Sequence, residues 1–215
     1  MNQLSFLDDG SKPSGRPAEP ILRSALIEDN YRLWLRRAWG SGPPIAWIGL
    51  NPSTADGQRD DPTMLREIGF SYRWGFGSLT KVNLYPFISA NPDAMHRWRA
   101  SWQTAEELDH SAREAFIRGA HVAADEIAKC DMVMAAWGNG ADDDDLAQWL
   151  DFIEGSLGRA VEFHCLGTTS SGAPKHPLAR GHHHIPADTN PQPWAVPGRY
   201  SPCLGTNCPT VDDGH

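Results

Sequence analysis

Short apolar runs alternate with helix-type patterns along the middle of the chain. Residues 45–50 are apolar without helical spacing, which predicts a buried central strand. Similar runs predict strands over 79–85, 131–137 and 161–166. Residues 31–39 alternate imperfectly, which favours an outer strand, and a helix that begins near Ala25 is the competing interpretation.

Helical spacing occurs between these strands. Asp61 and Pro62 predict a helix start, because aspartate caps a helix and proline fits its first position. Further helices are predicted over 112–129 and over 146–157, the latter preceded by four consecutive aspartates that suit a helix N-terminus. The alternation predicts an α/β three-layer sandwich around a central, mostly parallel sheet of about four to five strands.

The two ends of the chain differ from its middle. Residues 1–20 and 190–215 are rich in glycine, serine, proline and aspartate, which predicts a flexible arm and a flexible tail. Docking of Trp194 onto the domain is an alternative for part of the tail. The 215 residues are therefore expected to form a single α/β domain over 21–189.

Composition narrows the classes of partner. The formal net charge of −8 disfavours a broad basic face for duplex DNA. This charge is compatible with binding of a nucleobase, a nucleotide or a nucleic-acid segment held at a few phosphates. We expect a cytoplasmic protein without a membrane partner, because the start is not signal-like and no apolar run approaches the ~20 residues of a membrane helix. The oligomeric state is not predicted.

Metal sites are considered at two places, and the expectation is that the protein holds neither a metal nor a cofactor. Cys130 and Cys165 adjoin apolar runs and are expected in the core, whereas Cys203 and Cys208 lie in the tail. A zinc site from these two cysteines and the histidines at 182–184 is the alternative to a disordered tail. Asp56, Asp60 and Asp61 raise a magnesium alternative, although a capping role competes for Asp61.

Polar and small residues follow each predicted strand. The carboxyl ends of parallel strands meet at one edge of a sheet, where α/β proteins bind ligands, so these residues predict a shared pocket. Simpler interpretations are a turn opener at Asn51, a strand-end amide at Asn83, a core tryptophan and a surface histidine. The candidates are Gly49, Leu50, Asn51, Pro52, Ser53, Thr54 and Asp56 after the first central strand, Asn83 and Tyr85 after the second, Trp137 and Gly138 after the third, and Thr168, Lys175, His176 and Pro177 after the fourth.

Several of these stretches resemble a bacterial and phage family, domain of unknown function 1643. The matching segments follow one another between about residues 31 and 180, and the resemblance implies no established activity. They are residues 50–56, 60–63, 82–84, 135–138, 166–168 and 172–178.

The layout also resembles the uracil-DNA glycosylase superfamily more distantly. Its Gly-X-Asn-Pro loop corresponds to residues 49–52, its strand-end asparagine to Asn83, its Trp-Gly strand end to 137–138 and its His-Pro loop to 176–177. The resemblance implies a glycosylase-like fold in which Asn51 orients a water and His176 donates to the departing base. It further implies that Asn83 recognises the base edge.

Other roles in this hypothesis have several candidates. A stacking partner for the base is expected among Phe70, Trp74 and Tyr85. A phosphate is expected against Ser53, Thr54, Lys175 and the amides of residues 167–172. The chain departs from the superfamily at Leu178, which replaces a serine, and at the insert before His176.

The expected function is therefore a glycosylase-like pocket for a nucleobase or nucleotide, with cleavage of an N-glycosidic bond as its chemistry. Two alternatives accompany it. One is an enzyme that processes a nucleotide or a modified base, and the other is a non-catalytic nucleotide-binding module.

Overall fold

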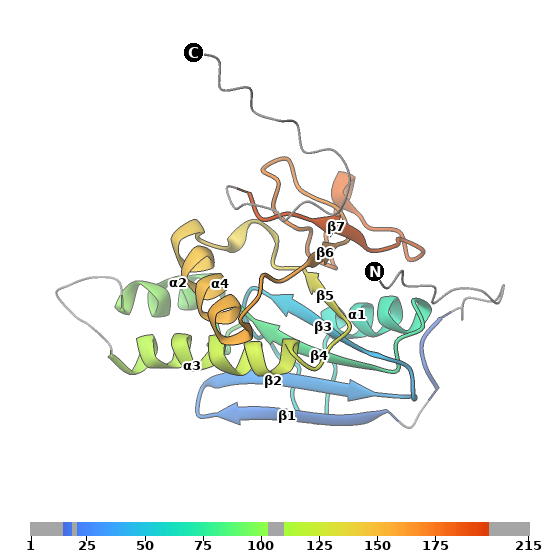
Figure 1. The fold of residues 1–215 in the computed structure, drawn as a ribbon, viewed down its shortest axis with the longest axis horizontal. Coiled ribbons are helices and arrows are strands. Elements are labelled where there is room, and N and C mark those ends of the chain that lie inside the picture. The colour runs from blue at the N-terminus through green and yellow to red at the C-terminus, as the bar shows by residue number, and fades with distance from the viewer. Residues whose placement is uncertain (1–14, 19–20, 103–109, 198–215) are drawn as a thin grey trace, which may run out of the picture.

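The computed structural model describes residues 15–18, 21–102 and 110–197 (Figure 1). Most of the expected arm, part of the expected tail and both Cys203 and Cys208 lie outside these ranges. The strands are β1 (Leu22–Glu28), β2 (Tyr31–Ala38), β3 (Pro44–Gly49), β4 (Ser78–Asn83), β5 (Met132–Ala135), β6 (Phe163–Cys165) and β7 (Gln192–Trp194). The helices are α1 (Pro62–Arg73), α2 (Pro92–Ser101), α3 (His110–Ile127) and α4 (Asp143–Leu157), with short 3-10 turns η1 (Gly138–Gly140) and η2 (Gly181–His183).

The strands form one mixed sheet in the order β1-β2-β4-β3-β5-β6-β7. Only β4, β3, β5 and β6 run parallel, and the outer strands are antiparallel to their neighbours. The α/β class is confirmed, whereas the expectation of four to five mostly parallel strands is wrong. The expectation fails at the two edges of the sheet. There the β1–β2 hairpin and the three-residue strand β7 add antiparallel strands, which do not require a connecting helix.

The segment around Ala25 is strand β1, so the competing helix is wrong. Its pairing with β2 makes β1 the edge strand and β2 an interior strand, in contrast to the outer position expected for residues 31–39. At the opposite edge, β7 pairs with β6 and adds residues 192–194 to the sheet, past residue 189. Trp194 is buried there against Trp137 and Phe163.

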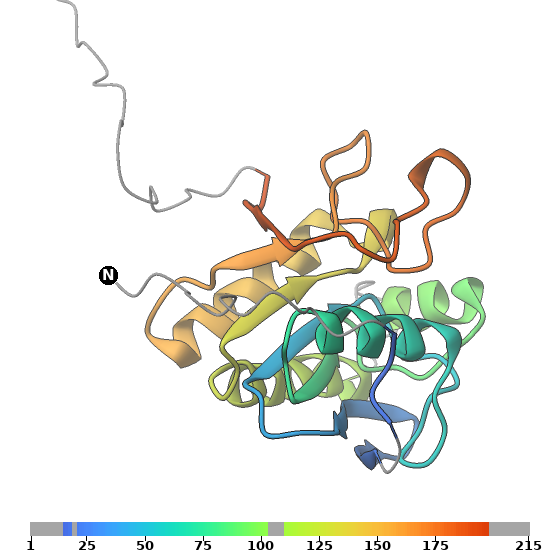
Figure 2. The same cartoon turned by 90° about the vertical axis from the view of Figure 1, so that its right-hand side faces the viewer.

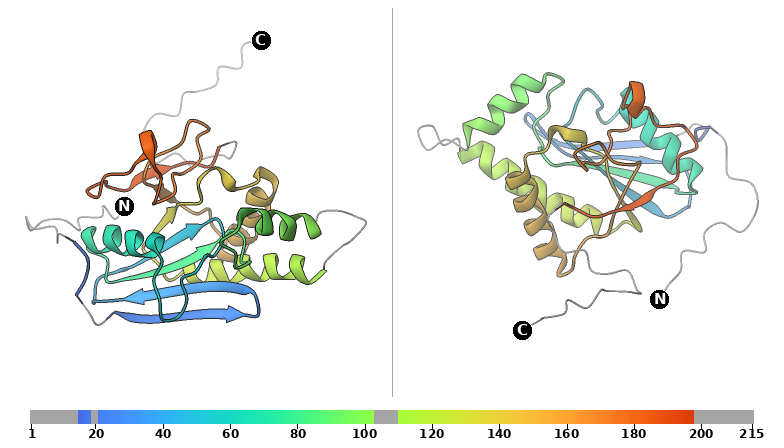
Figure 3. Two further views of the ribbon diagram at one scale, coloured as in Figure 1. Left: turned by 180° about the vertical axis from the view of Figure 1, so that it is seen from behind. Right: turned by 90° about the horizontal axis from the view of Figure 1, so that it is seen from above.

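Helices cover both faces of the sheet. Helix α1 packs on one face, and α2, α3 and α4 pack on the other (Figures 1 and 3). The core on the α1 side is aromatic, since Trp47 of β3 stacks on Phe70 of α1 and on Trp74, the C-cap residue of that helix. These two aromatic side chains, both considered above as stacking partners for a base, are therefore core residues.

The helix starts follow their local sequence. The Asp61 carboxylate accepts a hydrogen bond from the Met64 amide at 2.8 Å and Pro62 is the first helical residue, so the predicted cap is confirmed. Asp142 caps α4 in the same way ahead of three acidic residues. Asn91 and Pro92 begin α2 with the same signature, and this helix is absent from the sequence-based predictions.

The parallel strands place their carboxyl ends at a single edge, as expected. Long loops between β6 and β7 project from this edge (Figure 2). Among the described residues, no helix combines the length and apolar character required to cross a membrane. Nor do these residues contain a group of three or more His, Cys, Asp or Glu side chains placed to hold a metal ion.

Candidate functional site

Gly49 and Asn83 end the central strands β3 and β4 and lie opposite each other in the parallel ladder. A Cβ atom on residue 49 would lie 2.8 Å from Asn83 Oδ1 and 3.1 Å from Lys81 Cε. Real Cβ atoms essentially never come within 3.0 Å of another atom, so glycine at residue 49 leaves the space that the Asn83 amide occupies.

The Asn83 side chain is buried without a hydrogen-bond partner. Asn83 is 3% exposed, and neither its Oδ1 nor its Nδ2 is bonded. Leaving a buried polar group unsatisfied costs about 1–3 kcal/mol, and such groups are rare in native proteins. The amide is therefore held where a partner from outside the chain would stabilise it.

Glu67 and Arg32 also carry buried polar atoms without a partner. Among the described residues, eight buried side-chain atoms lack a partner, and four of them belong to Asn83, Glu67 and Arg32. Glu67 and Lys81 form a buried ion pair with 2.5 Å between Oε1 and Nζ. Burial raises the pKa of the Glu67 carboxyl, and the positive charge of Lys81 opposes this shift. We call Gly49, Glu67, Lys81, Asn83 and His176 the Asn83 site.

We group His176, from the loop after β6, with this site because the charge of Lys81 acts on its imidazole. Burial, together with the charge of Lys81, lowers the pKa of its imidazole to about 4, and the charge of Asp61 opposes this shift. The Leu178 amide donates to His176 Nδ1 at 3.2 Å, which leaves the proton of the neutral ring on Nε2. His176 is thus a neutral hydrogen-bond donor at pH 7. Its Cβ lies 3.7 Å from the position of a Cβ on Gly138.

Asn51 has a structural task. Its Nδ2 donates to the backbone carbonyls of Ser89 at 2.8 Å and Pro52 at 3.1 Å. These bonds tie the loop after β3 to the segment after β4, and they leave Oδ1 as the acceptor of the side chain. Leu50 points to the other face, where it packs against Gly140 and the core over α2–α4.

The rest of the loop after β3 carries a turn and a helix cap. Asp56 Oδ1 accepts from the amides of Gln58 and Arg59, and these bonds lower its pKa. Asp60 pairs with Arg37 and Arg23, so the carboxylates of the magnesium alternative are engaged inside the chain. The other candidates here differ in burial: Pro52 is buried, Ser53 is half-buried and Thr54 is exposed.

Tyr85 lies away from the Asn83 site. It is fully buried in the core over α2–α4, and its hydroxyl donates to the Asp145 carboxylate at 2.9 Å. Burial raises the pKa of the phenol. Arg99 also binds Asp145 and bridges to Asp142, so Tyr85 anchors the start of α4.

Several backbone amides of the loop 167–175 are bonded inside the chain. The amides of Thr169, Gly172 and Lys175 donate to carbonyls within the loop, and the Gly167 amide donates to Cys165 Sγ. Within the range 167–172, where a phosphate is expected, the amides of Gly167, Thr169 and Gly172 thus already donate inside the chain. The Lys175 side chain lies along Gly167, and Thr168 forms a bridge with Pro174.

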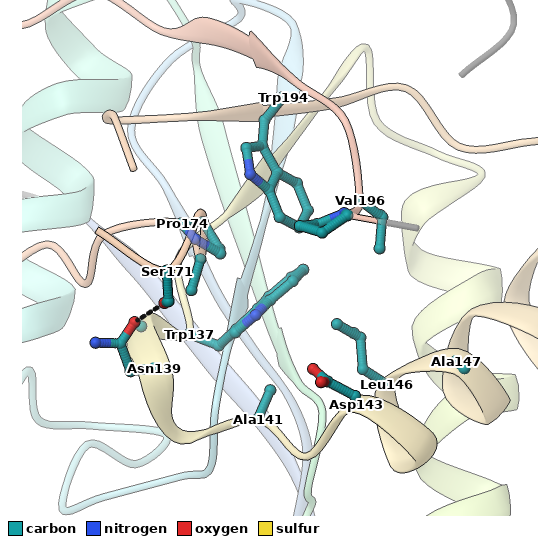
Figure 4. A pocket seen from close by; sticks show the side chains of 13 residues that line it. Trp137, Asn139, Ala141, Asp143, Leu146, Ala147, Ser171, Pro174, Trp194 and Val196 are labelled. Carbon is teal, nitrogen blue, oxygen red and sulfur yellow. Dashed lines mark hydrogen bonds between the residues drawn. The ribbon is translucent and has the colours of Figure 1, made fainter. Parts of the chain in front are cut away.

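Trp137 and Gly138 line a separate hollow beyond the end of β5, together with Trp194 (Figure 4). The predicted candidates thus divide into two groups. Gly49 and Asn83 lie together on the α1 side beside Lys81, whose charge acts on His176, whereas Tyr85 and Trp137 belong to the opposite layer. Sequence reasoning missed Lys81, although a lysine within the apolar run 79–85 is a signal of a buried charge.

The family comparison covers the whole Asn83 site. A family model described as "Protein of unknown function (DUF1643)" matches residues 32–178. The chain belongs to this family. The matched range of the DUF1643 protein contains every residue of the Asn83 site and ends before η2 and β7, so Trp194 lies outside it.

Other comparisons add no functional assignment. No curated protein matches the chain. Among solved structures, a hetero-hexameric glutamate dehydrogenase from Thermus thermophilus in a leucine-bound form is 15% identical. That match covers 66% of this DUF1643 chain and 32% of the dehydrogenase chain, at a TM-score of 0.31.

Proposed function

We propose that this protein binds a nucleobase, free or within a nucleotide, at the Asn83 site. The observation that carries the proposal is the Asn83 amide, which is 3% exposed and has two unbonded polar atoms. An amide offers a donor and an acceptor side by side, which complements the adjacent donor and acceptor on a base edge. A bound base would satisfy both atoms at once.

His176 and Lys81 support the same ligand. His176 presents a neutral Nε2–H donor, which suits a carbonyl oxygen of a base better than a phosphate. The charge of Lys81 is already matched by Glu67. The net charge of −8 further favours a free base or nucleotide over duplex DNA.

The chemistry we propose is cleavage of an N-glycosidic bond. Asn51 Oδ1 orients a water whose oxygen bonds to the anomeric carbon as the carbon–nitrogen bond breaks. The electron pair of the broken bond leaves with the base, and the water's proton passes to solvent. His176 Nε2–H donates to the oxygen on which the charge develops. With a pKa of about 4, His176 acts by this hydrogen bond, and the departing base takes its proton from solvent.

Binding and cleavage are tested separately. Calorimetry with uracil, hypoxanthine, their nucleosides and nucleotides measures binding to the wild type, to Asn83→Ala and to the control Asn30→Ala, an exposed asparagine in the β1–β2 turn. We expect at least a tenfold loss of affinity in Asn83→Ala, about 1.4 kcal/mol, and none in Asn30→Ala. Equal binding by both variants, or none by the wild type, would overturn the proposed site.

Cleavage is measured by incubating the protein with oligonucleotides that carry uracil, hypoxanthine or mismatched thymine, and with the free nucleotides that bind. Abasic products or released base, reduced in Asn51→Ala and His176→Ala, support the reaction. Binding of a free nucleotide that is recovered unchanged contradicts cleavage and favours a binding module. Conversion of a nucleotide without release of the base favours the nucleotide-processing alternative.

A further inference from the structure

A second hollow lies at the carboxyl ends of β5 and β6, on the α4 side of the sheet. Its volume is about 410 Å³, within the usual range of small-molecule sites. Trp137 and Trp194 form an aromatic wall, with ring centroids 5.3 Å apart and planes at 80°. Leu146 and Val196 add apolar surface (Figure 4). We call this hollow the tryptophan cavity.

One negative charge faces the tryptophan cavity. Asp143 is the sole charged side chain among the described residues that line it, and Figure 4 shows its carboxylate directed towards the cavity beside Leu146. Arg99 binds the neighbouring Asp142 and Asp145. Within the described ranges, Asp143 itself forms no ion pair, so its charge is available to a ligand.

The polar groups at the rim are engaged inside the protein. The hydroxyls of Thr169 and Ser171 donate to Asn139 Oδ1, and the Trp194 indole donates to the Gly172 carbonyl. Figure 4 shows the Asn139 amino group turned away from the cavity. The walls therefore offer indole surface, aliphatic surface and a carboxylate, and they lack a cationic group among the described lining residues.

We propose that the tryptophan cavity binds a small organic cation, namely a protonated amine on an apolar or aromatic body. An ammonium group is attracted both by a carboxylate and by the negative faces of indole rings. The apolar body would cover Leu146 and Val196, where its burial is favourable. This site is separate from the Asn83 site and does not depend on base binding there.

A matched pair of probes isolates the charge. Benzylamine and benzyl alcohol have nearly the same shape, but only benzylamine is charged at pH 7. Titration followed by ligand-observed NMR is expected to give affinity for benzylamine about tenfold above that for benzyl alcohol, a ratio that one exposed ion pair with an aromatic contact provides. Equal affinities for the two probes would overturn the proposal.

Two neighbouring carboxylates provide the control for location. Asp143→Asn is expected to abolish the preference for benzylamine, whereas Asp144→Asn, one residue further along the same exposed turn and outside the cavity lining, is expected to retain it. Equal losses in both variants would indicate a general surface field and overturn the proposal.

Asn83→Ala separates the two sites. Retention of benzylamine binding in this variant supports an independent cavity even where base binding fails. A loss as large as that in Asp143→Asn would place the amine elsewhere and overturn the proposal.

Discussion

Gly49 and Asn83 face each other across β3 and β4 at such close range that a methyl group on residue 49 would lie 2.8 Å from the Asn83 amide oxygen. Residues 49 and 83 each show an unusual feature at this point. The backbone at residue 49 must carry no side chain, and the buried amide at residue 83 has no internal partner. Both features are explained if the Asn83 amide occupies this space in order to bind a ligand.

Gly49→Ala is expected to displace Asn83 and to destabilise the protein by about 1–3 kcal/mol, the usual cost of an extra methyl group in a packed interior. Urea denaturation measures the change in the free energy of unfolding. Gly155→Ala is the control, because nothing lies within 4 Å of a Cβ at this position in α4 and alanine favours a helix by up to about 1 kcal/mol. Similar destabilisation in the two variants would contradict the close approach at Gly49.

Asn83→Leu is expected to leave the ligand-free protein as stable as the wild type, or more stable by about 1 kcal/mol. Leucine removes two unsatisfied polar atoms and keeps a similar volume. The same variant should lose the stabilisation that a bound base gives the wild type, which thermal melting with and without ligand reveals. A loss above about 2 kcal/mol without ligand would mean that Asn83 makes an internal bond.

The sequence predicts the central elements better than the edges of the fold. The run at 45–50 and the Asp61–Pro62 cap identify β3 and α1, because burial and capping are local properties. Strand β1 was ambiguous since its exposed edge carries no clear alternation, and β7 depends on pairing with β6 rather than on its own three residues. Edge strands are set by tertiary contacts that a local pattern does not contain.

The residues of the candidate site are likewise only partly predictable from the sequence. Strand order along the chain was enough to bring Gly49 and Asn83 to one edge, because the carboxyl ends of parallel strands coincide. The local sequence does not predict which face each side chain takes, so the expected pocket includes Tyr85 and Trp137, which lie in the other layer. The long side chains of Glu67 and Lys81 connect helix α1 to strand β4. The spacing of the two residues in the sequence does not reveal this contact.

Removal of one partner of the Glu67–Lys81 pair should be costly. Lys81→Met leaves the Glu67 carboxylate buried and unpaired, so we expect a loss of about 3–5 kcal/mol in the free energy of unfolding. Lys81→Met combined with Glu67→Gln should recover more than half of that loss, because no uncompensated charge remains. A double-mutant cycle by urea denaturation measures the coupling. Additive effects would contradict a direct buried pair.

His176 gives the site a defined pH dependence. Its folded pKa of about 4 lies below the ordinary value of 6.5, so the unfolded chain binds the proton more tightly. The His176 contribution to stability is therefore complete above pH 6.5 and is lost as the pH falls from 6.5 towards 4. Titration of the imidazole Cε1 proton by NMR should give a midpoint near 4 for His176, and removal of the Lys81 charge in the double variant should raise it. His176→Gln should remove this part of the pH dependence of unfolding, whereas a midpoint near 6.5 in the wild type would contradict the burial of the ring.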